Sequence, residues 1–141
     1  MEFQGITREA VAERLRARGI APTHQRIEIA FVLLERCEHL SADQILALVN
    51  ARHAETSKAT VYNTLRLFLD KQLIRELIVD PSRVFYDPNT SAHYHIYNVE
   101  TGKLIDIDAT EVRIEGLPQL PAGMVTEGMD IIIRVRHAQD S

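Results

Sequence analysis

The chain has 141 residues, of which 45% are hydrophobic and 26% charged, and its formal net charge is −4 at pH 7. These values are typical of a globular protein and exclude disorder as the overall state. No apolar run approaches the ~20 residues of a membrane-spanning helix, and the polar start does not resemble a signal peptide. The single cysteine, Cys37, excludes an internal disulfide framework and a multi-cysteine zinc cage. We therefore expect a reducing, cytoplasmic setting.

Charge is distributed unevenly along the chain. Residues 1–79 carry 11 Lys/Arg against 10 Asp/Glu, a net of +1, whereas residues 80–141 carry 5 against 10, a net of −5. The first part has helical spacing of its apolar residues, and the second is rich in β-branched residues and turn signals. The pattern predicts a near-neutral helical module followed by a small acidic α/β module.

The first part predicts four helices and a hairpin. The first helix covers residues 8–18 behind the capping residue Thr7, and the second opens at Pro22-Thr23. Ser41 to Gln44 has the form of a capping box before the third helix, and Ser57 caps the fourth. Two alternating strands follow at 73–79 and 83–86, joined by a turn. This order is typical of a winged helix-turn-helix.

The fourth helix is the best candidate for reading DNA. Polar and basic residues of its first turn can meet phosphates at the helix N-terminus, and Tyr62 and Asn63 are long enough to reach base edges. The alternative is a solvated helix with a tyrosine packed at its edge. The candidate DNA contacts are Arg16, Arg18, Ser57, Lys58, Thr60, Tyr62, Asn63 and Arg66.

Two histidines in the second part are candidate metal ligands. His93 and His95 are two apart and share one face of a predicted strand. With a two- or four-residue loop centred on Thr101–Gly102, Asp106 falls on the face of His95 in the diagonal position; a three-residue loop would turn it away. Asp87 lies in the flexible join, and His39 lies just before the third helix.

Three imidazoles and two carboxylates suit Fe(II) or Mn(II) better than ions that prefer thiolates. Each residue also has an ordinary explanation. A His-x-His on a strand can be a pair of solvent-exposed polar residues that bind nothing. Asp106 can end a strand, Asp87 can belong to a turn, and His39 can pack locally.

Three stretches of sequence closely resemble the ferric uptake regulator (Fur) family. They are Pro22-Thr23-His24-Gln25-Arg26, His39-Leu40-Ser41-Ala42-Asp43 and Ala59-Thr60-Val61-Tyr62-Asn63-Thr64-Leu65. His93-Tyr94-His95 and Gly102-Lys103-Leu104-Ile105-Asp106 lie where that family has its metal-binding region. The resemblance implies a dimeric, metal-responsive transcription regulator that binds double-stranded, pseudo-palindromic operator DNA and is not an enzyme. It also implies that Tyr62 contacts a base, and it strengthens the metal interpretation of the histidines.

Within the family, the chain combines features of two branches. Asp87 and Asp106 match the acidic ligand positions of the peroxide-sensing (PerR) branch, which implies peroxide oxidation at His39 or His93. Many members hold a structural zinc with Cys-x-x-Cys pairs, but Asn98 and Thr101 stand at the first pair and there is no second. We therefore expect no structural zinc held by four cysteines. This absence and the segment 85–91 resemble the iron response regulator (Irr) branch, which makes a haem-responsive regulator the alternative.

The predicted fold class is α+β, with a winged helix-turn-helix at residues 1–84, a hinge at 85–92, and an α/β dimerisation and metal-sensing domain at 93–141. The second domain is predicted to contain strands at 96–99, 103–107 and 129–135 and a helix over 109–115 capped by Asp108. About 50 residues bury little surface alone, so we expect a homodimer. A metal held by all five ligands would join the two modules. A non-haem iron enzyme and a metal-free regulator are the other functions considered.

Overall fold

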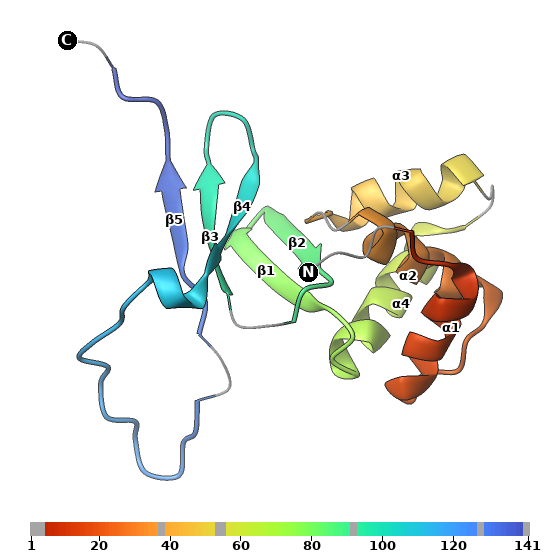
Figure 1. The fold of residues 1–141 in the computed structure, drawn as a ribbon, viewed down its shortest axis with the longest axis horizontal. Helices are drawn as coiled ribbons and strands as arrows, with labels where there is room; N and C mark the ends of the chain where they lie inside the picture. Colours follow the sequence, from red (N-terminus) through yellow and green to blue (C-terminus); the bar gives the residue numbers. More distant parts are fainter. Residues whose placement is uncertain (1–4, 37–38, 53–55, 91–92, 127–128, 140–141) are drawn as a thin grey trace. The chain divides into compact units, whose positions relative to one another are not determined.

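The computed structural model describes residues 5–36, 39–52, 56–90, 93–126 and 129–139. The chain divides into two compact units, residues 1–90 and 91–141, and Figure 1 shows the elements of each. The predicted α+β class is confirmed. Residues 85–87, which the predicted hinge included, belong to a strand of the first unit. In the parts of the chain that the structure describes, no helix is both long and apolar enough to cross a membrane.

The first unit begins with four helices whose ends follow local capping chemistry. They are α1 (Arg8–Ala17), α2 (His24–Arg36), α3 (Ala42–Arg52) and α4 (Lys58–Asp70). The Thr7 hydroxyl accepts from the backbone N–H of Ala10 at 3.1 Å, which caps α1 as predicted. Ser41 and Gln44 exchange the two bonds of a capping box, at 2.9 and 3.2 Å. These local bonds explain why the helix starts could be predicted from sequence.

The hydrophobic core of the first unit lies between the helices and the hairpin. Its fully buried members come from all four helices and include Leu15, Leu33, Ile45 and Phe68. A salt bridge also joins α1 to α2, because Arg8 Nε lies 2.6 Å from a carboxylate oxygen of the buried Glu28. This packing holds α4 in place, with one helix face buried in the core and the opposite face exposed to solvent.

A two-stranded antiparallel hairpin completes the winged helix-turn-helix. Its strands are β1 (Arg75–Asp80) and β2 (Arg83–Asp87). In the turn between them, the Asp80 carboxylate accepts from the backbone and the hydroxyl of Ser82, and these bonds lower the pKa of Asp80. The hairpin continues beyond the predicted strand end at residue 86, because Asp87 pairs in register with Arg75.

The second unit is built on a three-stranded sheet. Its strands are β3 (His93–Asn98), β4 (Leu104–Asp108) and β5 (Ile132–Val135). In Figure 1, β3 lies in the middle, with β4 antiparallel on one side and β5 parallel on the other. All three predicted strands are present, and β5 begins three residues later than predicted.

The helix predicted over 109–115 is wrong in its length. Only a single 3-10 turn forms, η1 (Ala109–Glu111), and Asp108 caps it as predicted by accepting from Thr110. Val112 is already extended, with φ −120° and ψ 126°. The β-branched residues Val112 and Ile114 disfavour helix here, and Gly116 and Pro118 follow at once. No regular element is assigned to residues 112–126.

Candidate metal ligands and DNA-reading helix

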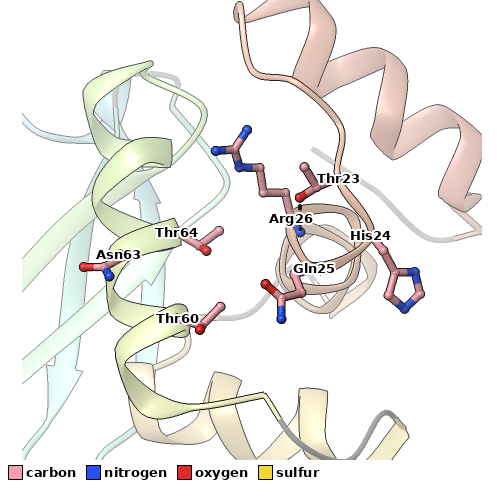
Figure 2. A pocket seen from close by; sticks show the side chains of 7 residues that line it. All are labelled: Thr23, His24, Gln25, Arg26, Thr60, Asn63 and Thr64. Atoms are coloured by element: carbon pink, nitrogen blue, oxygen red, sulfur yellow. Dashed lines mark hydrogen bonds between the residues drawn. The ribbon is translucent and has the colours of Figure 1, made fainter.

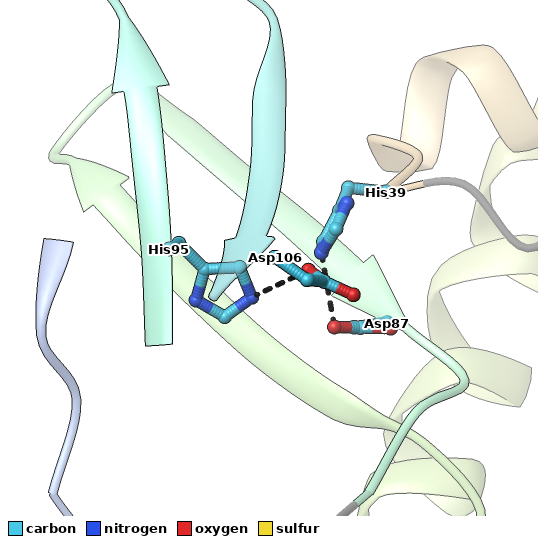
Figure 3. A group of neighbouring side chains, drawn as sticks. All are labelled: His39, Asp87, His95 and Asp106. Carbon is cyan, nitrogen blue, oxygen red and sulfur yellow. Dashed lines mark ion pairs between the residues drawn. The ribbon is translucent and has the colours of Figure 1, made fainter. Parts of the chain in front are cut away.

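The first candidate metal-binding pair lies within the first unit. His39 Nε2 is 3.0 Å from Asp87 Oδ2, and both side chains are about nine-tenths buried (Figure 3). His39 immediately precedes the bridge residue Leu40 ahead of α3, and Asp87 is the last residue of β2. The prediction of Asp87 in a flexible join is wrong, because the residue ends a paired strand and its second carboxylate oxygen accepts from the backbone of Asn89 at 2.9 Å.

The second pair lies within the sheet of the second unit. His95 and Asp106 are direct partners across β3 and β4, and His95 Nε2 is 3.4 Å from Asp106 Oδ1. The His95 side chain is buried, whereas that of Asp106 is 41% exposed. The shared face is as predicted, but the diagonal placement of Asp106 is wrong.

The hairpin turn explains this difference in register. The loop is centred on Glu100–Thr101, one residue earlier than predicted. The Asn98 carboxamide oxygen accepts from the backbone N–H groups of Glu100 and Thr101, at 2.9 and 3.1 Å. Gly102 completes the turn with a φ of +76°, a conformation that favours glycine. Moving the centre by one residue shifts the pairing by two, which keeps Asp106 on the predicted face.

The remaining predicted ligand, His93, has only its backbone described. It begins β3 and pairs in register with Asp108. Its side chain lies outside the described residues, as do Cys37 and His53. In a strand, residues 93 and 95 lie on the same face, so the backbone assignment of β3 agrees with the predicted strand.

Each unit therefore supplies one imidazole and one carboxylate within ion-pair distance. Nitrogen and oxygen donors of this kind suit divalent first-row metals and lack the thiolate that softer ions prefer. His39, Asp87, His95 and Asp106 are the described side chains that could hold a metal ion. The donor chemistry of each pair fits a divalent metal.

The start of α4 carries the candidate DNA contacts. Ser57 caps the helix by accepting from the backbone N–H of Thr60 at 3.1 Å, and the two hydroxyls lie 2.9 Å apart. Both hydroxyls therefore stabilise the start of the helix. Ser57 is exposed and Thr60 is half-buried. Lys58 reaches over the ring of Tyr62, with its ammonium 5.7 Å from the ring centroid.

The outer face of α4 is open. Tyr62 is 42% exposed, and Asn63 and Arg66 are exposed beside it. Arg16 and Arg18, which were predicted as basic contacts of the first helix, are also exposed, and Arg16 forms a salt bridge with Glu13. An aromatic ring, an amide and a guanidinium on one helix face provide groups that can contact bases and phosphates.

A polar hollow of about 490 Å³ lies between the starts of α2 and α4 (Figure 2). In Figure 2, the Gln25 and Arg26 side chains lie on the side of α2 nearer α4, whereas His24 points away. The sequence interpretation did not include these α2 residues among the DNA contacts. The polar run at the start of α2 was a usable signal. The lining residues are Thr23, His24, Gln25, Arg26, Thr60, Asn63 and Thr64.

The model of the ferric uptake regulator family matches residues 17–127, most of the chain. The chain belongs to the ferric uptake regulator family. This confirms the family predicted from the motifs, and since Fur proteins are transcription regulators, the prediction that the chain is not an enzyme holds as well.

Two relatives within the Fur family are peroxide-responsive repressors. PerR of Staphylococcus aureus strain Mu50 is 37% identical over 112 residues, which are 79% of this chain and 75% of that protein. PerR of Staphylococcus epidermidis is 35% identical over 112 residues, covering 79% and 74%. The chain is thus similar to the PerR-like members.

Solved structures of Fur proteins share the fold. The ferric uptake regulator of Pseudomonas aeruginosa, solved with manganese, has a TM-score of 0.69 at 23% identity and covers 90% of this chain and 97% of its own. The Campylobacter jejuni peroxide stress regulator has a TM-score of 0.61 at 18% identity, covering 94% and 97%. At these identities, the likeness concerns the fold alone.

Proposed function

We propose that this Fur protein is a metal-dependent, DNA-binding transcription regulator with a divalent-metal site made by both units. The observation that carries this proposal is that each unit contributes a buried histidine next to an aspartate, His39–Asp87 in one and His95–Asp106 in the other. Two ligands are few for Fe(II) or Mn(II), which take about six. One ion bound by both pairs, with His93 as a fifth ligand, would have five of these ligands from the protein.

The proposed site would make DNA binding depend on metal. His39 and Asp87 belong to the unit that carries α4, and His95 and Asp106 belong to the sheet unit. An ion that needs ligands from both units favours conformations in which the two pairs meet. If DNA binds those conformations more tightly, metal affinity and DNA affinity are linked by the same free energy.

For DNA recognition, we propose that α4 enters the major groove. Tyr62 and Asn63 would contact bases, while Lys58, Arg66 and the α4 N-terminus would contact phosphates. The hollow between α2 and α4 adds amide and hydroxyl groups beside this helix. Arg16 and Arg18 of the first unit would add phosphate contacts away from the groove.

A homodimer is the proposed assembly. One face of the three-stranded sheet carries a row of isoleucines, because Ile96 pairs in register with Ile105 on β4 and Ile133 on β5. Ile105 and Ile133 are 49% and 43% exposed. Covering this row with the same face of a second copy would bury apolar area and need no structural zinc held by cysteines. Two α4 helices in one dimer suit a pseudo-palindromic operator.

For the signal, we propose Fe(II) or Mn(II) binding with a response to peroxide. The PerR relatives named above support a peroxide response, and the His/Asp donor set supports these ions. Bound Fe(II) would supply the reactivity toward peroxide. The alternative is a haem-responsive regulator of the Irr type, which the motif comparison in the sequence suggests.

The proposal is tested by measuring DNA binding of full-length protein anaerobically. The duplex is one that the protein itself selects from a random-sequence pool. We expect affinity to rise with Fe(II) or Mn(II), to fall with chelator, and to fall after peroxide treatment of the Fe(II) form but not of the Mn(II) form. Equal affinity with metal and with chelator would reject metal dependence, and a response to haem alone would favour the alternative.

A further inference from the structure

A backbone bridge ties the two ligands of the first unit together. Leu40, next to His39, and Tyr86, next to Asp87, form an isolated antiparallel bridge. The Tyr86 N–H donates to the Leu40 carbonyl at 2.8 Å, and the Leu40 N–H donates to the Tyr86 carbonyl at 3.3 Å. A backbone movement that changes the spacing of residues 39 and 87 would therefore also move Tyr86.

The side chain of Tyr86 points to the opposite face of β2 from that of Asp87. Adjacent strand residues alternate between faces, and the register places Asp87 opposite Arg75 but Tyr86 opposite Glu76. Tyr86 is 7% exposed and belongs to the core cluster that contains Val61, Leu65 and Phe68 of α4. At the end of β2, one face thus carries the proposed ligand Asp87. The other face carries Tyr86, which packs into the core beneath α4.

The charges of two proposed DNA contacts on α4 also influence the phenol group of Tyr86. Burial raises the pKa of Tyr86; the charges of Glu76 and Tyr62 raise it further, and the charge of Arg66 lowers it. Tyr62 and Arg66 are among the proposed DNA contacts. Tyr86 is therefore adjacent to the His39–Asp87 pair through the backbone, and its side chain shares the core cluster of α4.

We propose that Tyr86 is a positioning residue that couples the His39–Asp87 pair to α4. The inference rests on the proposed metal-dependent function. When metal draws His39 and Asp87 into a fixed arrangement, the bridge fixes the backbone of Tyr86. Its side chain shares the core cluster with Val61, Leu65 and Phe68 and thereby orders the Tyr62–Arg66 part of α4. Because a protein core is closely packed, a shift at the strand end cannot be absorbed without a shift of its neighbours.

The test is Tyr86→Phe in the full-length protein, which removes the hydroxyl and keeps the ring. The probes are Mn(II) and a duplex selected by the wild-type protein. The ratio of DNA dissociation constants in chelator and in Mn(II) is expected to fall about 3- to 10-fold, a typical effect of one residue on coupling. Mn(II) affinity without DNA and DNA affinity in chelator should stay within about 2-fold of wild type.

Reciprocity gives a second readout that needs no comparison of DNA affinities. DNA should raise Mn(II) affinity less in the variant than in wild type, by the same factor. Tyr94→Phe is the matched control, because Tyr94 is a half-buried tyrosine that flanks proposed ligands in the other unit. Tyr94→Phe should leave the ratio of DNA dissociation constants unchanged. A fall equal to that of Tyr86→Phe would show a general effect of tyrosines beside ligands and would overturn the role assigned to Tyr86.

The double variant His39→Ala/Tyr86→Phe separates failure of this inference from failure of the proposed function. If Tyr86 acts through the metal pair, its substitution should change nothing further once His39 is absent. A wild-type protein that ignores Mn(II) would reject the proposed function and this inference with it. A responsive wild type whose coupling survives Tyr86→Phe would reject the role of Tyr86 alone.

Discussion

Asp106 lies directly across the sheet from His95, and the two side chains differ sharply in exposure. The imidazole is buried, the carboxylate is 41% exposed, and their nearest atoms are 3.4 Å apart. A buried ligand is held in place by its packing, whereas an exposed one retains water as an alternative partner. The two members of this pair should therefore contribute unequally to metal binding.

We expect His95→Ala to abolish high-affinity Mn(II) binding and Asp106→Asn to weaken it about 10-fold or less. The reason is that His95 is buried at the centre of the proposed site, while solvent water can replace the exposed Asp106 oxygen. Isothermal titration calorimetry with Mn(II) measures both changes. His93→Ala should resemble His95→Ala, and His137→Ala, a change at an exposed histidine, is the control. A larger loss in Asp106→Asn than in His95→Ala would contradict the argument from burial.

Removing His39 should separate metal binding from DNA binding. His39→Ala leaves the His95–Asp106 pair of the second unit in place, so we expect residual, weaker Mn(II) binding without the metal-induced gain in DNA affinity. Asp87→Asn should lower both Mn(II) affinity and the metal-induced gain in DNA affinity, but by less, because the amide still offers a neutral oxygen as a metal ligand. Titration with Mn(II), paired with DNA binding, reports both quantities. Full metal-dependent DNA binding by His39→Ala would refute a site shared by the two units.

Tyr62 and Lys58 should affect DNA binding in different ways. Tyr62→Ala should cost about 1–3 kcal/mol on a selected duplex and blur sequence preference, because a base contact is lost. Lys58→Ala should weaken all duplexes alike and reduce the salt dependence, because a phosphate contact is lost. Fluorescence anisotropy at several salt concentrations separates the two patterns. Unchanged selectivity of Tyr62→Ala would mean that α4 does not read bases.

Much of the fold was predictable because its signals are local. The caps Thr7, Ser41 and Ser57 each bond a backbone N–H three residues on, so their effect is visible in a short stretch of sequence. The alternation of side chains between the two faces of a strand is equally local. For this reason Asp106 could be expected on the same face as His95. The turn centre depended on one side chain, Asn98, and was misplaced by one residue.

The environment of Asp87 could not be predicted in the same way. Next to it, Tyr86 forms a bridge with Leu40, a pairing between segments far apart in the chain. An isolated bridge leaves no repeating pattern in the sequence, since it involves only one residue on each side. The helix over 109–115 failed for a different reason: the Asp108 cap was a correct start signal, but β-branched residues and Gly116 ended the helix after one turn.

The exposed isoleucine row on the sheet should control dimerisation. Ile105→Asp or Ile133→Asp should shift full-length protein toward monomer, because a carboxylate would be buried in the proposed interface. Ile78→Asp is the control, since Ile78 is also an exposed strand residue but belongs to the hairpin of the first unit. Sedimentation velocity of chelator-treated protein measures the state. Dissociation of the wild-type protein by chelator alone would mean that metal, and not sheet packing, holds the dimer.

Ser57 lies at a position where stability and DNA binding can be separated. Its hydroxyl accepts from the Thr60 N–H at 3.1 Å, so Ser57→Ala should lower the free energy of unfolding by about 1 kcal/mol. Ser57→Asp keeps an acceptor and suits the helix dipole, so stability should be retained. Its carboxylate would repel phosphates at the same helix start, so DNA affinity should fall further than in Ser57→Ala.

The matched control for Ser57 is Thr7, which caps α1 with the same geometry, at 3.1 Å to the Ala10 N–H. Thr7→Ala should cost a similar free energy of unfolding because the same kind of bond is lost, but it should leave DNA affinity unchanged. Urea unfolding and DNA anisotropy on the same preparations measure the two effects. If Ser57→Asp bound DNA as tightly as wild type, the start of α4 would not lie against a phosphate, and the docking of this helix in the major groove would have to be redrawn.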